Sequence, residues 1–254
     1  MSWLSIFAVA PDQAAWVGLA VGFAAAIRAF TGFGFALLVV PVFSLFLSPG
    51  DAVVLSAALA LILGAVSHRS WWGLFPTTPA IPMLAGASAG TAIGVWFLAS
   101  LSVNEFQLWI GLLVVVASVV TARFKPSERS SSPPVALGTG IASGLMNGAF
   151  AIPGPPVILY VIATMDNPVQ SRAFLMMFFC CSSVVSLAMF GFAGLITARP
   201  FQLLWVALPM MWLGNSLGNL AFNRFAGGAY RTFVVGLCVA IGLAIFLRAL
   251  MSGT

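Results

Sequence analysis

Long runs of apolar residues, separated by short polar or Pro/Gly clusters, occupy nearly the whole chain. A helix that crosses a bilayer needs about 20 predominantly apolar residues. The pattern therefore predicts an all-α polytopic membrane protein with about eight to ten crossings. The ten predicted segments are 13–30, 32–48, 52–67, 79–99, 106–122, 135–150, 153–165, 172–195, 201–222 and 230–250.

The two halves of the chain carry similar glycine motifs in the same order. GFAAAIRAFTGFG begins at Gly22, and GIASGLMNGAFAIPG begins at Gly140, which is 118 positions later. GASAG at 86–90 is matched 128 positions later by GNSLG at 214–218, and GLLVVV and GLCVAI complete the series. The shared order and the near-constant separation indicate an internal repeat.

The repeat divides a single transmembrane domain, 1–254, into repeat 1 (13–122), a linker (123–134) and repeat 2 (135–250). The linker, RFKPSERSSSPP, is charged, rich in serine and ends in two prolines. Each repeat has five segments, an odd number, so the two repeats are expected to have opposite orientations in the membrane. Inverted repeats of this kind are a recurrent architecture of secondary transporters.

Charged residues make up only 6% of the 254 residues, and hydrophobic residues make up 61%. A soluble globular domain carries roughly 25% charged residues, so this composition excludes a soluble enzyme and a nucleic-acid-binding module. The net charge of +5 fits the bias of basic residues toward cytoplasmic loops. If the linker is cytoplasmic, eight of the ten basic residues fall on the inner side and both termini fall outside. We therefore expect a multi-pass protein of the inner (plasma) membrane.

Glycine and proline are concentrated at the start of each repeat. The first repeat contains Arg28-Ala-Phe-Thr31-Gly32-Phe-Gly34, and the second contains Asn147-Gly148-Ala-Phe-Ala-Ile-Pro153-Gly154-Pro155-Pro156. Glycine and proline at this density interrupt a membrane helix. The 13 residues of segment 153–165 would span about 20 Å as a helix, less than the ~30 Å core of a bilayer. We predict a broken or re-entrant helix at the start of each repeat.

A helix that starts after such a break presents free N–H groups and the positive end of its dipole, which attract anions. Inverted symmetry would bring the two helix starts to the membrane midplane, where we expect one anion site at the repeat interface. Thr31 and Asn147 would add hydrogen-bond donors, and Arg28 a full positive charge. The predicted substrate-binding residues are Arg28, Thr31, Gly32, Gly34, Asn147, Gly148, Gly154 and Pro155. The structural alternative is that the glycines allow close helix packing and that Arg28 extends to the inner membrane surface.

The sequence offers little for catalysis. GxSxG occurs around Ser88 and Ser216, but it recurs in both halves and His68 is the one histidine. Close helix packing explains these glycines better than a nucleophile elbow does. Cys180 and Cys181 are expected to pack as apolar residues. A P-loop, a metal-ligand pattern and an acid deep inside a segment are all missing from the sequence, so we expect no enzyme, no cofactor and no metal.

Three features of the chain resemble the TauE/SafE family of sulfite exporters. They are Thr31-Gly32-Phe-Gly34 leading to Pro41, the counterpart GAFAIPGPP from Gly148 to Pro156, and the basic central loop. The resemblance covers nearly the whole chain and implies a permease for small sulfur anions such as sulfite or sulfonates. It also implies a set of residues at the permeation site, namely Thr31, Gly32, Gly34, Gly148, Gly154 and Pro155.

The expected function is transport of a small sulfur-containing anion, such as sulfite or an organosulfonate, by alternating access around a midplane anion site. Three alternatives are open: a channel-like passive anion pathway, an intramembrane serine hydrolase using Ser216 or Ser88 with His68, and a non-transporting scaffold subunit. The expected partners are the anionic substrate and the lipid bilayer, with no nucleic acid, and a homo-oligomer is left open. The sequence specifies neither the direction of transport nor a coupling ion.

Overall fold

The structure, a computed structural model, describes residues 11–31, 34–123, 132–225 and 229–252. Over these residues the chain forms ten α-helices and one short 3₁₀ turn, η1 (His68–Ser70), and no strand. The α-helices are α2 (Pro11–Thr31), α3 (Phe35–Phe43), α4 (Pro49–Val66), α5 (Thr77–Ser100), α6 (Val103–Arg123), α7 (Pro133–Phe150), α8 (Gly154–Thr164), α9 (Pro168–Phe192), α10 (Ala198–Phe225) and α11 (Ala229–Ser252).

Each of the ten segments predicted from the apolar pattern coincides with one helix, so the all-α prediction is confirmed. The largest difference lies at α3, which ends at Phe43, five residues before the predicted boundary at 48. The chain turns there because Ser44 donates its hydroxyl proton to the Pro41 carbonyl (2.6 Å), and Gln107 of α6 donates to the Ser44 carbonyl (2.6 Å). The predicted linker 123–134 falls largely on residues 124–131, outside the described residues.

Four of the described helices are long and apolar enough to cross a membrane, judged by length and composition. They comprise Pro49–Val66, Thr77–Ser100, Val103–Val120 and Val169–Phe192. By contrast, α3 has nine residues and α8 has eleven. At ~1.5 Å per residue these helices are about 14 and 16 Å long, roughly half the ~30 Å core of a bilayer.

The helices group into two compact units. Unit 1 comprises Met1–Ser56, Ser102–Ser118 and Ile196–Thr254, and unit 2 comprises Ala57–Leu101 and Val119–Leu195. Each unit contains helices from both halves of the chain. Thus α2 and α3 share unit 1 with α10 and α11, whereas α5 shares unit 2 with α7, α8 and α9.

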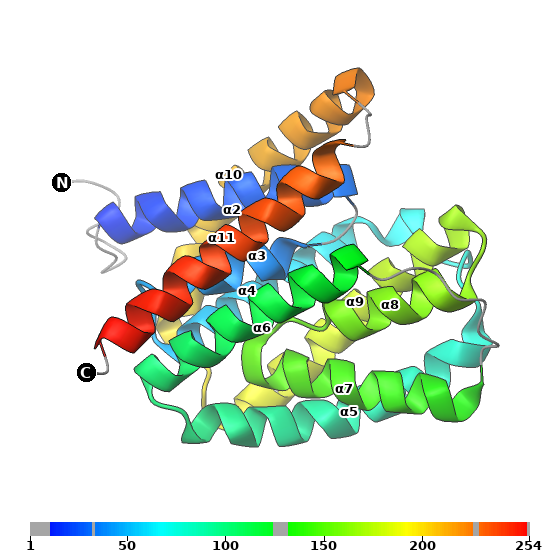
Figure 1. Cartoon of the computed structure of the whole chain (residues 1–254), viewed down its shortest axis with the longest axis horizontal. Coiled ribbons are helices and arrows are strands. Elements are labelled where there is room, and N and C mark those ends of the chain that lie inside the picture. Colours follow the sequence, from blue (N-terminus) through cyan, green and yellow to red (C-terminus); the bar gives the residue numbers. More distant parts are fainter. Residues whose placement is uncertain (1–10, 32–33, 124–131, 226–228, 253–254) are drawn as a thin grey trace. The chain divides into compact units, whose positions relative to one another are not determined.

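In unit 2, α5 and α7 lie side by side with their backbones in direct contact (Figure 1). A Cβ atom on the α5 glycines would collide with the carbonyl oxygens of Leu137, Ile141 and Leu145. A Cβ atom on the α7 glycines would collide with those of Met83, Ala87 and Thr91. We call this contact the α5–α7 seam; its glycines are Gly86, Gly90, Gly94, Gly140, Gly144 and Gly148. The spacing of four places them on one face of each helix, so the packing role predicted for the first GxSxG is confirmed.

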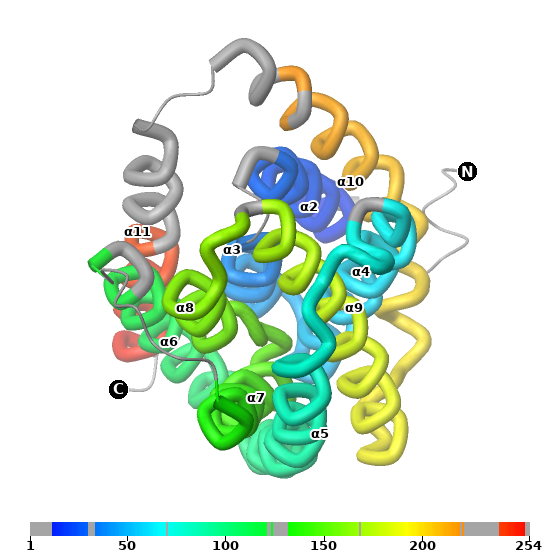
Figure 2. The backbone as a smooth tube through the Cα atoms, turned by 90° about the vertical axis from the view of Figure 1, so that its right-hand side faces the viewer, coloured from blue at the N-terminus to red at the C-terminus, as the bar shows by residue number. Residues whose placement is uncertain are grey.

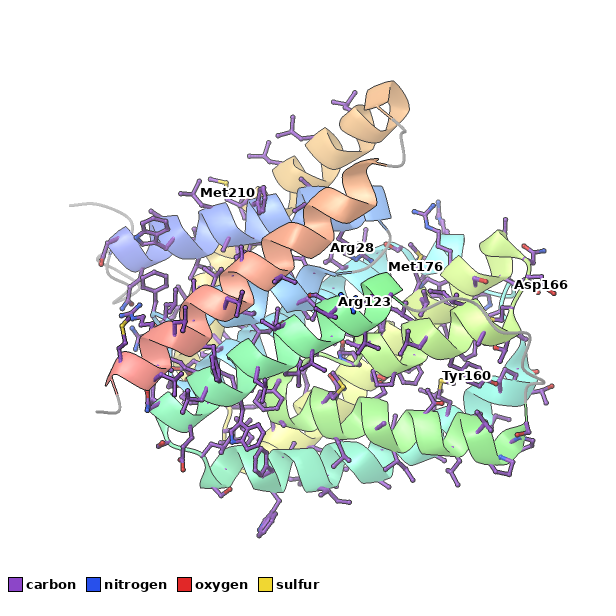
Figure 3. The ribbon with its side chains drawn as sticks, viewed as in Figure 1. Arg28, Arg123, Tyr160, Asp166, Met176 and Met210 are labelled. Atoms are coloured by element: carbon purple, nitrogen blue, oxygen red, sulfur yellow. The ribbon has the colours of Figure 1, made fainter. Side chains whose placement is uncertain are left out.

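In unit 1, α2 and α10 form the corresponding contact, the α2–α10 seam (Figure 2). A Cβ atom at Gly214 would collide with the carbonyl of Gly22, and one at Gly218 with the carbonyl of Ala26. Met210 of α10 completes the seam beside Gly18 and Gly22 (Figure 3). The second GxSxG is therefore also a packing motif, and Ser216 lies on the exposed side of α10.

The helix that follows each short helix begins with the same four-residue capping pattern. In unit 1, Ser48 accepts a hydrogen bond from the Asp51 N–H (3.2 Å) at the start of α4. In unit 2, Asn167 Oδ1 accepts hydrogen bonds from the N–H groups of Val169 (2.9 Å) and Gln170 (3.4 Å) at the start of α9. Both N-caps precede a proline, Ser-Pro-Gly-Asp and Asn-Pro-Val-Gln, and they lie 119 positions apart. Such side-chain caps satisfy the otherwise unpaired N–H groups of a helix start.

The core of unit 2 is built mainly from aromatic and sulfur-containing side chains. Phe174, Phe178, Met83 and Met177 are almost completely buried within one cluster. Cys180 and Cys181 are free thiols that pack half-buried against this cluster, as the sequence predicts. Figure 3 marks Met176, another member of the cluster, on α9.

Candidate functional site

The first break separates α2 from α3 and belongs to unit 1. Gly34 is the N-cap of α3, with φ of 92° and ψ of −5°. This left-handed conformation costs any residue with a Cβ atom roughly 1–2 kcal/mol. A Cβ atom at Gly34 would have nothing within 4 Å, so the backbone conformation, not the available space, requires the glycine.

The start of α3 is rich in backbone donors. The residues that open α3 are Phe35, Ala36 and Leu37, each of which carries an N–H. The first intrahelical bond is donated by Leu38 to the Gly34 carbonyl (3.2 Å), because the first N–H groups of a helix have no acceptor within it. These three N–H groups and the dipole of α3 suit an anion.

The remaining predicted residues of the first half lie at the end of α2. Arg28 is half-buried in the last turn of that helix (Figure 3). A cation there is favoured by the negative end of the helix dipole, and it lies within one turn of the break. Thr31 is the last residue of α2, but its side chain lies outside the described part of the structure, as does Gly32. A role of Arg28, Thr31 and Gly32 in binding therefore stays a prediction.

The second break separates α7 from α8 and belongs to unit 2. Ala151 ends α7 in a left-handed conformation (φ 53°), and its N–H bonds the Asn147 carbonyl (2.7 Å). The left-handed Ala151 and its bond to the carbonyl four residues earlier form an αL cap, and the Ile152 N–H bonds the Met146 carbonyl (3.4 Å). Ser143 is fully buried and donates to the Pro153 carbonyl (2.6 Å), which ties α7 to the start of α8.

The start of α8 offers fewer backbone donors than the start of α3. Its first three residues are Gly154, Pro155 and Pro156, and the two prolines carry no N–H. Gly154 is half-buried and Pro155 is buried. The α8 dipole is present, but only one N–H of these three residues can contact an anion.

Asn147 is a buried polar side chain in the last turn of α7, and both of its amide N–H groups are engaged within unit 2. Its side chain is 3% exposed, and its Nδ2 donates to Ser186 Oγ (2.6 Å) and to the Ser182 carbonyl (3.2 Å) of α9. Because a carbonyl only accepts hydrogen bonds, the amide nitrogen must face α9. Asn147 therefore links the last turn of α7 to the middle of α9 inside unit 2.

The two predicted glycines of the second break have different surroundings. Gly148 belongs to the α5–α7 seam, where any Cβ would collide with the Thr91 carbonyl, so packing alone requires a glycine there. At Gly154 a Cβ would lie 3.4 Å from Ile158 Cδ1 and 3.9 Å from Phe179 Cζ, which are ordinary contacts. Gly154 is thus required neither by packing nor by a positive φ.

The structure brings the second-half residues Asn147, Gly148, Gly154 and Pro155 together within unit 2. Arg28 and Gly34 flank the first break within unit 1. The convergence of the two breaks on one anion site stays a prediction.

Among the described acids, Asp12, Asp51 and Glu105 lie in the first turns of α2, α4 and α6. Ser102 donates to Glu105 Oε2 from its N–H (2.8 Å) and its hydroxyl (2.6 Å). Asp51 is 5% exposed and accepts hydrogen bonds from Ser48 Oγ (2.8 Å) and Thr197 Oγ1 (2.6 Å). Carboxylates are stabilised at helix N-termini, and these contacts give Asp51 and Glu105 a capping role.

The residues required for a serine hydrolase have other partners. Ser88 Oγ donates to the Leu84 carbonyl (2.9 Å) of its own helix. His68 is exposed in η1, where its Nδ1 lies 3.0 Å from the Ala65 carbonyl. Neither GxSxG lies on a turn between a strand and a helix, the context that a nucleophile elbow needs.

Sequence reasoning missed the polar residues of α9. Ser182, Ser183 and Ser186 are each less than 5% exposed, and Ser182 and Ser186 bond Asn147. The signal was present, because three serines within five positions are unusual in an otherwise apolar segment. These serines do not interrupt a helix, so the glycine and proline pattern that predicts the site does not include them.

The chain is similar in sequence to known transporters. The profile of the family described as "Sulfite exporter TauE/SafE" matches residues 17–245. A protein of Cupriavidus necator named "Probable sulfite/organosulfonate exporter TauE" is 25% identical over 230 residues, 87% of this chain and 88% of its own length. A protein of Comamonas testosteroni named "Probable inner membrane transporter protein TsaS" is 25% identical over 201 residues, 77% of this chain and 81% of its own length. No solved structure matches the chain. The chain therefore belongs to the TauE/SafE family, and it is a multi-pass membrane transporter, not an enzyme.

Proposed function

We propose that this protein transports a small sulfur-containing anion, such as sulfite or an organosulfonate, across the membrane by alternating access. The names of the two relatives, an exporter of sulfite or organosulfonates and an inner membrane transporter, support the substrate class and the inner membrane. The observation that carries the proposal is the pair of short helices, α3 and α8, each of which starts directly after a break.

Two inverted repeats are part of the proposal, and the element order supports them. Pairing the helices in order matches α2 through α6 with α7 through α11. The paired short helices begin 119 positions apart, at Phe35 and Gly154, and the helices after them begin 119 apart, at Pro49 and Pro168. The two seams also correspond, because α5 pairs with α10 and α7 with α2. An odd number of membrane crossings per repeat would reverse the orientation of the second repeat.

The proposed anion site combines two kinds of donor. From the first break come the N–H groups that open α3, with Gly34 shaping the turn and Arg28, Thr31 and Gly32 nearby. From the second break come the Gly154 N–H and the dipole of α8, with Pro155 in its first turn. Asn147, whose two amide N–H groups bond α9, holds the end of α7 beside them. Half-helix N-termini that face an anionic substrate near the bilayer midplane are a known device of transporters with inverted repeats.

The seams indicate which bodies move during alternating access. In each seam, a helix from one half of the chain packs against a helix from the other half through backbone contacts. Sliding along such a contact would move residues with a Cβ atom to places where only glycine clears the partner's carbonyl oxygens, and close-packed interfaces do not deform continuously. We propose that the moving bodies are the two units, and that each seam stays closed.

The proposed orientation places the linker in the cytoplasm and both termini outside. A single cysteine at Ser130 in a variant without native cysteines tests it. The cysteine should resist a membrane-impermeant thiol reagent in intact cells and react after permeabilisation. Labelling in intact cells would reverse the orientation.

Flux into liposomes tests the transport function. Purified protein should carry labelled sulfite or taurine with a saturable rate, and unlabelled substrate on the far side should accelerate that rate. Flux that is neither saturable nor trans-stimulated would indicate a channel-like passive pathway. Absence of flux for every sulfur anion tested would overturn the proposed function and favour a scaffold subunit.

A further inference from the structure

Two buried hydroxyls in unit 2, those of Thr91 and Ser182, have no hydrogen-bond partner among the described atoms. Ser182 lies in the middle of α9, is 2% exposed, and its Oγ makes no hydrogen bond. An unpaired buried hydroxyl is destabilising, and native proteins contain few of them. In a helix a serine hydroxyl can bond the carbonyl four positions earlier, as neighbouring Ser183 does with Phe179 (2.8 Å). Ser182 does not use that alternative.

The polar groups around Ser182 are already engaged. Asn147 Nδ2 donates to Ser186 Oγ and to the backbone carbonyl of Ser182 itself. Ser143, one turn earlier on α7, donates to the Pro153 carbonyl at the start of α8. We call Ser143, Asn147, Ser182 and Ser186 the polar cluster. Ser182 is the member of this cluster whose side chain takes part in no hydrogen bond, so its hydroxyl can donate to a ligand without breaking one.

The cluster also lies beside the start of α8. Ser143 contacts Pro153, the N-cap of α8, and a Cβ atom at Gly154 would lie 3.9 Å from Phe179, one turn before Ser182 on α9. Of the first three residues of α8, only Gly154 carries an N–H. A hydroxyl from α9 supplies the kind of donor that this helix start lacks.

The donors of this cluster are neutral. On α9 the charged residue nearest in sequence to Ser182 is Arg172, ten positions away, or about 15 Å along the helix. The cost of moving an ion out of water rises steeply with its charge, and neutral hydrogen bonds offset that cost less well than a paired charge does. Such a site favours an anion with one charge and several oxygen acceptors.

From these observations, and resting on the proposed transport function, we propose that Ser182 binds an oxygen of the substrate. The substrate class that fits is a singly charged oxyanion of the sulfonate type. Asn147 and Ser186 act as positioning residues, because their hydrogen bond fixes the turn of α9 that carries Ser182.

Substrate binding by three proteins tests this assignment: the wild type, Ser182→Ala, and the matched control Ser183→Ala. The probe is whichever of sulfite and methanesulfonate the wild type carries faster in liposomes. Ser182→Ala should weaken binding about 10- to 100-fold, the effect of losing a hydrogen bond to a charged group. Ser183→Ala should bind as the wild type does, because its hydroxyl bonds its own helix. The wild type should bind sulfate, a dianion of similar size, at least about tenfold more weakly than methanesulfonate.

Thermal melting without substrate separates binding from structure. Ser182→Ala removes an unpaired polar group, so its melting temperature should equal or exceed that of the wild type. Should Ser182→Ala fail to fold, Ser182→Cys, with similar volume and a weaker donor, takes its place. Equal substrate affinity in Ser182→Ala and wild type, or equal losses in Ser182→Ala and Ser183→Ala, would overturn the assignment. Failure of the wild type to bind or carry any sulfur anion would instead overturn the proposed function.

Discussion

The two helix breaks occupy matching places in the two halves of the chain, yet they use different chemistry. The first break starts α3 on a left-handed glycine, and all three opening residues of that helix carry an N–H. The second break starts α8 with Gly-Pro-Pro, and it is held by the side chains of Ser143 and Asn147. The first half also carries a charge, Arg28, where the repeat alignment places Met146 in the second. One half-site depends on backbone donors and a cation, the other on neutral side chains.

The largest difference between the two breaks lies at the end of α7. Gly148 belongs to the α5–α7 seam, whereas the aligned residue of the first half is Phe30, 118 positions earlier. Gly148→Leu should therefore abolish folding, because overpacking a tight interface costs about 1–3 kcal/mol or more and here the obstacle is backbone. Fluorescence-detected size-exclusion chromatography should show aggregate in place of a monodisperse peak. Gly138→Leu is the control on the same helix, where a Cβ meets nothing within 4 Å; a folded Gly148→Leu protein would contradict the seam.

The next largest effect should come from Arg28, the charge that the first break has and the second lacks. Arg28→Gln should reduce transport about 10- to 100-fold if the guanidinium contacts the anion, since hydrogen bonds between charged groups are the strong ones. Arg28→Lys keeps the charge and should retain part of the activity. Rates are measured in liposomes at equal amounts of folded protein. Unimpaired transport by Arg28→Gln would remove Arg28 from the site and leave the first half with backbone donors alone.

The two glycines at the helix starts should respond differently to the same substitution. Gly34→Ala forces a Cβ into the left-handed region and should lower stability by about 1–2 kcal/mol. Gly154→Ala should change stability by less than about 0.5 kcal/mol, because the position has room and no positive φ. Thermal melting of the two variants in the same detergent measures the difference. Equal losses of stability would mean that the two breaks are held by the same means.

The smallest effect should come from restoring a donor to α8. Pro155→Ala adds an N–H to the first turn of the helix and should tighten substrate binding about two- to fivefold, the scale of a dipole interaction at a helix end. Its melting temperature should fall slightly, because the substituted chain gains freedom in the unfolded state. Isothermal titration with the transported anion measures the binding. An unchanged dissociation constant would exclude the start of α8 from contact with substrate.

Much of the fold could be predicted from the sequence, because each helix is an apolar run whose ends are marked by polar, glycine or proline residues. The break after α7 and the short α8 followed from Pro153-Gly154-Pro155-Pro156. The sequence predicts that the glycines form close helix contacts, but it does not predict which helices they contact. Gly86 packs on α7 and Gly214 on α2 because of tertiary contacts between distant segments, and single-helix patterns do not encode such contacts.

The site was less predictable than the fold. The sequence predicts Gly34 from its place in a glycine-rich stretch, and the structure adds the physical reason, its left-handed φ. Asn147 was expected as a donor, but its partners Ser182 and Ser186 lie at least 35 positions away, and nothing local in the sequence links them. The paired caps, Ser48-Pro49 and Asn167-Pro168, were a local signal of the repeat that could have been read directly.

The seams also constrain how the protein is made. The glycine face of α2, which ends at Thr31, has its partner in α10, which begins at Ala198. During synthesis, α2 must therefore remain in the membrane with that face uncovered by its native partner until most of the chain has emerged. The α5–α7 seam can close much sooner, because Pro133 follows Ser100 by only 33 residues. Unit 2 can thus assemble while the chain is still on the ribosome, and unit 1 is the last part of the protein to be completed.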